Sequence, residues 1–592
     1  MPELHDPFKK SVAESVASQL EALHGEALQA QPVTLADIAA LLAIPPEFQL
    51  GQAALPCFTF AKKLRSAPPK IAAELAAGIN GQPRLLIEKT EAHNGYINFH
   101  CDMPTYVREL TRAVESGSYF TRKLLSPSET ETVSIEYSQP NTHKALHVGH
   151  MRNMVYGSAI CNLLAYAGHK VIAATYPGDL GAHIAKALWY IQTQKGGALP
   201  DHDHADWLGR IYCESEEYVR SQDGSPEVAA RIKSEISVVL KALQEKQGPY
   251  YTLYQTTREW SLQEMRSVYA WLGIHFDQWY FETECDEPSR LLVVKKYEEG
   301  FFAKSEGAVG IDLSDYNLGF ALLLKSDGNG LYLTKDLELI RRKFEDPAVT
   351  RSIVIIDTLQ KLHFQQLYKI AELLGYPQAA KSLALLYETV TTQEGAPFSS
   401  RDLNGVQLHT LRRMMEAKVV KDYLEQYRGQ WSDEEIRTTA EQVTLGALKY
   451  GFLRVDTSTV IRFDLEEWLK LEGDTGPYLQ YVHARCVSLL EKVGRPEADF
   501  KVVFEHAFEK ELGFFLGRFN DHALVAAQTY RPSVVAAYLY DLCKAFNRFY
   551  KECPIKTAAG DLRNSRLALV ECTAEVLRKG LELLGIPAPQ RM

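Results

Sequence analysis

The chain has 592 residues with 46% apolar and 24% charged side chains, an ordinary balance for a globular protein of about three or four domains. Its net charge of −10 does not indicate a nucleic-acid-binding protein, although a local basic surface could still hold RNA. The sequence lacks a membrane-length apolar run, an N-terminal signal sequence and a Cys-x-x-Cys pair, which predicts a cytoplasmic protein without a membrane span, disulfide framework or bound metal.

Residues 1–115 are predicted to form an α+β domain. A helical start is followed by mixed segments that include the strand-like residues 95–100, GYINFH. Lys62, Lys63 and Arg65 form a basic cluster that could contact phosphate. A solvated helix face is the other interpretation of this cluster.

Residues 134–150, SIEYSQPNTHKALHVGH, place an acid, an amide, a lysine and two of the histidines on a strand-to-helix turn. The apolar residues Val133, Ile135 and Tyr137 alternate with polar ones, which predicts a strand with two distinct faces that ends at Pro140. Helical spacing of apolar residues then runs from 151 to the glycine stop at Gly168.

The tetrapeptide 147–150 is therefore expected at the N-terminus of a helix. Unpaired backbone N–H groups and the helix dipole favour an anion there, and Gly149 lets a ligand approach the backbone closely. His147 and His150 could add donors to a phosphate or nucleotide site. By itself, an HxGH tetrapeptide favours the other interpretation, a surface turn.

Two further regions follow from the pattern. Residues 125–430 alternate strand-like segments such as TVSIEYS, KVIAATY and SIVIID with helical ones, which predicts an α/β domain with a Rossmann-like parallel sheet. A charged helical insertion is expected at about 195–300, and residues 435–592 are predicted to be all-α. Tyr478 and Tyr481 share one helix face in that last region, where they could stack on unpaired bases or pack in a core.

Several separated motifs occur in a recognisable order. Glu136, Pro140, Asn141 and Lys144 precede HVGH at 147–150, and YLTKD at 332–336 and a Gln-x-x-His element at 360–363 follow. With these motifs the chain resembles the arginyl-tRNA synthetases, which are class I aminoacyl-tRNA synthetases, over nearly its whole length. The resemblance implies ATP-dependent conversion of L-arginine to arginyl-adenylate and transfer of the arginyl group to the 3′ end of tRNA(Arg). Mg²⁺ is expected to arrive with ATP, and the protein is expected to be a monomer.

The same resemblance assigns roles to the outer domains. The N-terminal domain is expected to touch the tRNA elbow, and the C-terminal helices are expected to bind the anticodon. Tyr478, Tyr481 and the terminal Met592 are the residues that the resemblance proposes for anticodon contact.

A site for free arginine must satisfy a planar guanidinium with five donors, and carboxylates do this best. The resemblance places Tyr332 and Asp336 at the guanidinium, Glu136 and Asn141 nearer the ammonium and carboxylate, and Gln360 at the edge of the pocket. Lysine cannot satisfy the same acceptors, so no editing site is needed. Each residue also has a structural interpretation: Asp336 as a first-turn acid after strand-like residues 330–333, Tyr332 as core, and Glu136 as partner of a structural arginine.

For ATP, the resemblance implies Lys144, His147, Gly149 and His150, with Lys144, His147 and His150 catalytic. The mobile loop of class I enzymes corresponds to residues 397–401, PFSSR, where Ser399, Ser400 and Arg401 are expected to contact ATP. Both lysines usual in that loop are missing, and Lys144 is expected to compensate. A solvated turn lysine is the alternative for Lys144.

A second departure is GDLGAH at 178–183, where Leu180 and His183 stand in place of the usual Trp and Gln. This departure keeps open the alternative that the protein is a catalytically impaired paralogue that binds arginine or RNA for regulation. The retained histidines argue against that alternative, and the long helical C-terminus argues against a third one, a small-molecule nucleotidyltransferase.

Overall fold

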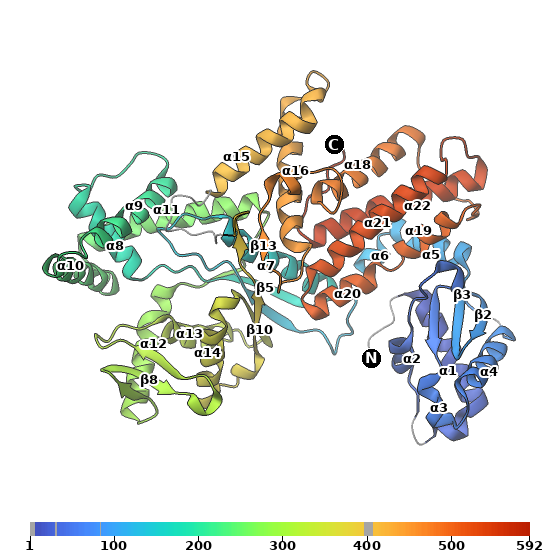
Figure 1. Cartoon of the computed structure of the whole chain (residues 1–592), viewed down its shortest axis with the longest axis horizontal. Helices are drawn as coiled ribbons and strands as arrows, with labels where there is room; N and C mark the ends of the chain where they lie inside the picture. Colours follow the sequence, from blue (N-terminus) through green and yellow to red (C-terminus); the bar gives the residue numbers. More distant parts are fainter. Residues whose placement is uncertain (1–5, 30–31, 83, 396–406) are drawn as a thin grey trace.

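The computed structural model describes residues 6–29, 32–82, 84–395 and 407–592. Figure 1 shows an N-terminal unit in blue, a central part built around a sheet, and a C-terminal bundle of helices in orange and red. The predicted fold class is confirmed: a parallel-sheet α/β part lies between an α+β unit and an all-α unit. None of the helices within the described residues has the length and apolar character needed to cross a bilayer.

The N-terminal unit is an antiparallel sheet in the order β1-β3-β2 with helices packed on it. Its elements are α1 (Pro7–Leu28), α2 (Leu35–Leu41), β1 (Ala53–Pro56), α3 (Phe58–Leu64), α4 (Pro68–Asn80), β2 (Ile87–His93) and β3 (Tyr96–Cys101). Helix α5 (Met103–Glu115) and the short α6 (Ser118–Thr121) then lead towards the central part. Lys62, Lys63 and Arg65 are exposed at the end of α3, which both interpretations of this basic cluster require.

The central sheet has the order β11-β10-β4-β5-β6, and every neighbouring pair is parallel. Its strands are β4 (Thr132–Glu136), β5 (Lys170–Thr175), β6 (Gln278–Trp279), β10 (Arg351–Asp357) and β11 (Ser382–Tyr387). The expectation of two distinct faces on β4 is wrong, because Ser134 and Glu136 are as buried as Val133 and Ile135. A parallel sheet covered on both faces explains this burial.

Helix α7 (Val148–Ala167) follows β4 and ends at Gly168, as the sequence predicts. It packs against the sheet so closely that a Cβ on Gly157 would lie 2.2 Å from the Tyr137 ring. Glycine at this position therefore sets the distance between α7 and β4, and with it the position of the helix N-terminus.

The chain leaves the central sheet after β5 and returns to it at β6. In between lie α8 (Ala182–Gln194), α9 (His204–Ser221), α10 (Pro226–Gln244) and α11 (Pro249–Trp271), which enclose a small apolar core of their own. Next come α12 (Glu282–Glu298), the antiparallel strands β7 (Ala303–Ser305), β8 (Ala308–Asp312) and β9 (Phe320–Leu324), and α13 (Tyr332–Lys343). The strand-like character expected at 330–333 is wrong, because α13 already begins at Tyr332.

After β10, the 3₁₀ turn η3 (Thr358–Gln360) leads into α14 (Lys361–Leu373). The remaining elements are β12 (Val390–Thr391), α15 (Leu408–Val419), α16 (Asp433–Leu453), β13 (Ile461–Arg462), α17 (Leu465–Trp468), α18 (Gly476–Val493), α19 (Ala507–Leu516), α20 (Phe519–Thr529), α21 (Pro532–Glu552) and α22 (Gly560–Leu583). Figure 1 shows α18 to α22 together as a bundle beside α7 and the N-terminal unit. Helix α7 contacts α16, α20, α21 and α22, so the strand-to-helix turn is anchored by the bundle.

Candidate functional site

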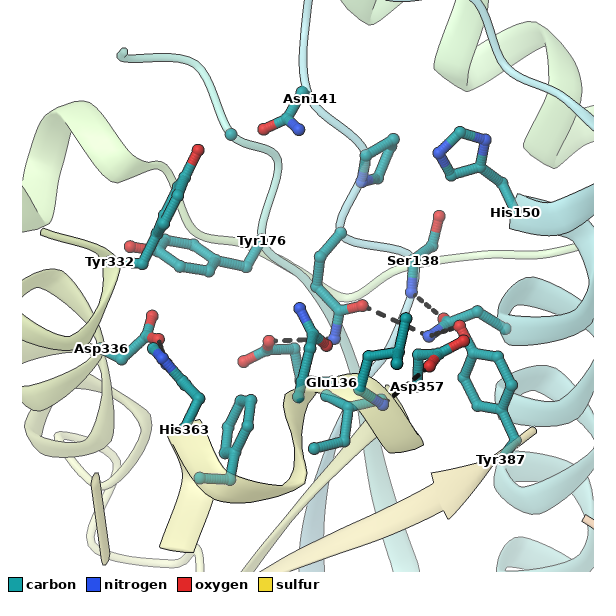
Figure 2. Close-up of a pocket in the computed structure, with 18 of the residues that line it drawn as sticks. Glu136, Ser138, Asn141, His150, Tyr176, Tyr332, Asp336, Asp357, His363 and Tyr387 are labelled. Atoms are coloured by element: carbon teal, nitrogen blue, oxygen red, sulfur yellow. Dashed lines mark hydrogen bonds and ion pairs between the residues drawn. The ribbon is translucent and has the colours of Figure 1, made fainter. Parts of the chain in front are cut away.

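A cavity of about 580 Å³ opens at the carboxyl ends of β4 and β10, beside the N-terminus of α7. Ligands of open parallel sheets bind at this edge. Figure 2 shows the polar side chains that converge there from β4, α7, α13 and α14. Of the residues expected from the sequence, the cavity is lined by Glu136, Asn141, Gly149, His150, Tyr332, Asp336 and Gln360.

Asp336 faces His363 across the cavity wall. The two side chains come from α13 and α14, and His363 Nε2 lies 2.6 Å from Asp336 Oδ2 (Figure 2). Because α13 begins at Tyr332, Asp336 is more than a turn inside the helix, so the interpretation as a first-turn acid is wrong. Tyr332 is 55% exposed at the cavity mouth, so the core interpretation is also wrong.

Glu136 is almost completely buried and has a buried cation beside it. Lys343 Nζ lies 2.5 Å from one of its carboxylate oxygens, and Gln139 donates to the other at 3.1 Å. The structural partner considered from the sequence is therefore a lysine from α13, not an arginine. This pair leaves Glu136 within the cavity lining, where it still presents an acceptor surface.

Asn141 is fixed by the segment that follows β5. Thr142 N donates to Gly178 O at 2.9 Å, and Gly178 N donates to Pro140 O at 3.1 Å. A Cβ on Gly178 would lie only 2.2 Å from Asn141 Oδ1, so only glycine allows this approach. The 178–183 segment thus positions a cavity residue through its backbone.

The two unusual residues of that segment have different surroundings. Leu180 is buried in the core of the α8–α11 helices, and its carbonyl accepts from Lys335 Nζ at 3.1 Å. His183 Nε2 is buried without a hydrogen-bond partner among the described residues. Burial holds the pKa of His183 well below its usual value, so this ring is neutral.

Glu282 lines the cavity, although sequence reasoning did not identify it. It starts α12 and forms a buried ion pair with Lys335 at 2.7 Å. Burial raises the pKa of Glu282 to about 7, although Lys335 opposes this shift. The lysine within the YLTKD motif was the available signal, since a buried lysine requires an acid.

His147 caps α7. His147 and His150 each accept a backbone N–H on the same ring nitrogen, Nδ1. Gly149 N donates to His147 Nδ1 at 3.1 Å, and His147 N donates to His150 Nδ1 at 3.2 Å. Burial lowers the pKa of His147 to about 4 and that of His150 well below its usual value. Both rings are therefore neutral and carry their proton on Nε2, as donors.

Lys144 lies behind this turn, outside the cavity lining. Its ammonium sits 4.8 Å from the centre of the Tyr212 ring of α9. It is also near enough to His150 and His183 to lower the pKa of both. Ser399, Ser400 and Arg401 lie outside the described residues.

The family models of three domains match the chain in order. The arginyl tRNA synthetase N-terminal domain matches residues 10–101, the class I (R) tRNA synthetase catalytic domain 117–465, and the DALR anticodon-binding domain 479–592. The chain belongs to the arginyl-tRNA synthetase family. The match to the catalytic domain includes every residue that lines the cavity, together with His147 and His150.

Full-length relatives agree with this membership. The arginine–tRNA ligase of Bdellovibrio bacteriovorus is 44% identical over 560 residues, covering 94% of this chain and 95% of that protein. That of Clostridioides difficile is 30% identical and covers 99% of this chain and 100% of that protein. The arginyl-tRNA synthetase structure of Thermus thermophilus superimposes with a TM-score of 0.77 at 27% identity, over 99% of this chain and 100% of that one.

The residues expected at the anticodon have unequal exposure in this synthetase. Tyr478 OH accepts from Asn547 at 2.8 Å, and its ring packs on Tyr540, so much of it is part of the bundle. Tyr481, one turn further along α18, is 39% exposed. Met592 is half-buried, with its main-chain carbonyl 3.5 Å from Tyr427 OH.

Proposed function

We propose that this chain activates L-arginine with ATP in the cavity beside α7 and transfers the arginyl group to the 3′ end of tRNA(Arg). The observation that supports this most strongly is the convergence of Glu136, Asn141, Tyr332, Asp336 and Gln360 on one cavity with Gly149 and His150 at its edge. The first group offers acceptors for a guanidinium and an ammonium, and in the second His150 offers a donor for phosphate while Gly149 leaves room for it beside the N-terminus of α7.

In the first step, a carboxylate oxygen of arginine attacks the α-phosphorus of ATP, and the bond to the pyrophosphate oxygen breaks. In the second, a ribose hydroxyl of tRNA attacks the arginyl carbonyl, and AMP leaves with the bonding electron pair. Neither step requires a protein nucleophile. The protein contributes by positioning the reactants and by stabilising negative charge on the phosphates.

We assign this stabilisation to His147 and His150 as neutral Nε2–H donors, and to Lys144 as a cation. Mg²⁺ would enter bound to the ATP phosphates. In the structure, Lys144 rests on Tyr212 and would have to turn from that ring towards the nucleotide. Tyr481, with the exposed edge of α18, would contact the anticodon, and Tyr478 and Met592 would support that surface.

The decisive experiment is arginine-dependent exchange between ATP and pyrophosphate, with and without tRNA(Arg), followed by aminoacylation. We expect both activities with tRNA(Arg). Loss of both with a competent tRNA would favour the impaired paralogue. Exchange with another amino acid would contradict the assigned specificity.

A further inference from the structure

The acids that line the cavity differ in what neutralises them. Glu136 faces Lys343 and Glu282 faces Lys335, both through buried ion pairs. Asp357 caps the turn η3 by accepting from Leu359 N at 2.9 Å. Asp336 differs because its close partner is His363, whose charge is not permanent.

The His363 contact has a definite hydrogen-bond direction. An ionised carboxylate can only accept, so a neutral His363 must carry its proton on Nε2 and donate to Asp336 Oδ2. This bond uses one of the roughly four lone-pair positions of the carboxylate. It fixes the orientation of Asp336 and leaves its charge available to a second donor.

We infer that His363 is a positioning residue for arginine binding: in its neutral form it orients Asp336 towards the guanidinium, and in its protonated form it competes with the guanidinium for the same carboxylate. This inference rests on the proposed function, because it takes Asp336 as the guanidinium acceptor. The side chains of His363 and Asp336 are 29% and 14% exposed, so a ligand in the cavity can reach the pair.

Protonation reverses the effect of the contact. A neutral imidazole leaves one full negative charge on Asp336, whereas an imidazolium forms an ion pair that cancels it. The guanidinium of arginine stays charged throughout. Because a lower pH favours the protonated form, arginine affinity should fall as the pH is lowered.

Other titratable and charged groups face this pair and must be distinguished from it. They are Tyr332, Lys335 and Lys343 of α13, Glu136 of β4, Glu282 of α12, Asp357 of β10, Tyr387 of β11, Tyr368 of α14 itself, Tyr176 after β5 and His150 of α7. Glu282 is the main alternative source of a pH effect. Its pKa is about 7, so its protonation on acidification would also remove negative charge from the cavity. Variants of His363 separate the two groups.

The test is calorimetric titration of the full-length protein with L-arginine at about pH 6 and about pH 8. The wild type should bind at least about fivefold more weakly at the lower pH. His363→Gln supplies an uncharged N–H donor, so its Kd should match the wild type at the higher pH and change less than the wild-type Kd at the lower pH, with Glu282 as the source of any remaining dependence. His363→Ala should bind about tenfold more weakly than the wild type at about pH 8, because it loses a hydrogen bond to a charged group, and the difference should narrow at about pH 6, where the wild type itself is weakened.

His100→Gln is the matched control, since His100 forms the same kind of contact with Glu91 at 3.1 Å in the N-terminal unit. It should leave the Kd and its pH dependence unchanged. A wild-type Kd that is constant with pH, or a His363→Gln variant that keeps the wild-type pH dependence, would overturn this inference and leave the proposed function standing. Failure of the wild type to bind arginine at all would overturn the proposed function with it. His363→Gln by itself decides the outcome if His363→Ala does not fold.

Discussion

Asp336 is the residue on which arginine selectivity should depend most. Asp336→Asn keeps the shape but removes the charge, so charge-assisted hydrogen bonds to the guanidinium become ordinary ones. We expect the KM for arginine to rise by about tenfold to a hundredfold, while the KM for ATP changes much less. Steady-state exchange kinetics at varied arginine and varied ATP measure both.

The exposed Asp223, between α9 and α10, offers a control for the same chemical change. Asp223→Asn should leave both constants unaltered. An Asp336→Asn variant in which the two KM values rise equally would contradict a direct pocket role.

Lys144 should affect turnover instead of arginine affinity. Its ammonium lies near His150 but outside the cavity lining, which suits a cation that reaches the phosphates only during the reaction. Lys144→Ala should therefore lower kcat by about a hundredfold, the usual cost of one transition-state donor. Single-turnover adenylate formation is the measurement, with the exposed Lys233→Ala on α10 as control. An unchanged rate would show that Lys144 does not compensate for the two lysines missing from residues 397–401.

At the scale of elements, the site depends on how closely α7 approaches β4. Gly157→Ala would place a methyl group 2.2 Å from the buried Tyr137 ring. Overpacking of this kind costs about 1–3 kcal/mol, more than the roughly 1 kcal/mol that alanine gains over glycine in a helix. We expect a lower melting temperature and a lower kcat, because the helix N-terminus moves with α7.

Gly224→Ala provides the comparison, since nothing lies within 4 Å of the added Cβ. It should melt at or above the wild-type temperature. Equal melting temperatures for Gly157→Ala and the wild type would show that α7 can shift without cost.

Element prediction succeeded where local signals were strong. The strand at β4, the helix N-terminus at 147–150 and the stop at Gly168 were predicted because alternation, breakers and helical spacing are properties of neighbouring residues. The burial of Ser134 and Glu136 was not predicted, because burial depends on layers contributed by distant segments. The strand-like character of 330–333 was also wrong, since the bridge at Gly330 is followed at once by α13.

At the scale of the whole molecule, Lys449 joins three parts of the chain. This buried residue of α16 donates to Leu272 O, at the end of α11, at 2.6 Å and to Gly585 O, just after α22. Both carbonyls lie at helix C-termini, where a cation is favoured. Burial nevertheless lowers the pKa of Lys449 to about 8.

A pH-dependent stability follows from that shift. The unfolded chain, in which lysine titrates near pH 10.4, binds more protons than the folded one between about pH 8 and 10, so folding gains stability as the pH rises through this range. The gain is at most about 3 kcal/mol for this residue. The melting temperature of the wild type minus that of Lys449→Met should be larger at about pH 10 than at about pH 8. A difference in melting temperature that is independent of pH would contradict the shift.

The sequence by itself determined the order of domains and the strand-to-helix turn, because motif spacing and periodicity are local, and its resemblance to a family indicated seven of the residues that line the cavity. Only the tertiary structure decided which partner each acid has: Lys343 for Glu136, Lys335 for Glu282 and His363 for Asp336. These partners come from separate elements, and their meeting depends on the order of strands in the sheet and on how α12, α13 and α14 pack. The helix N-terminus of 147–150 was thus predictable, whereas the charge state of the pocket beside it follows from contacts that no local pattern encodes.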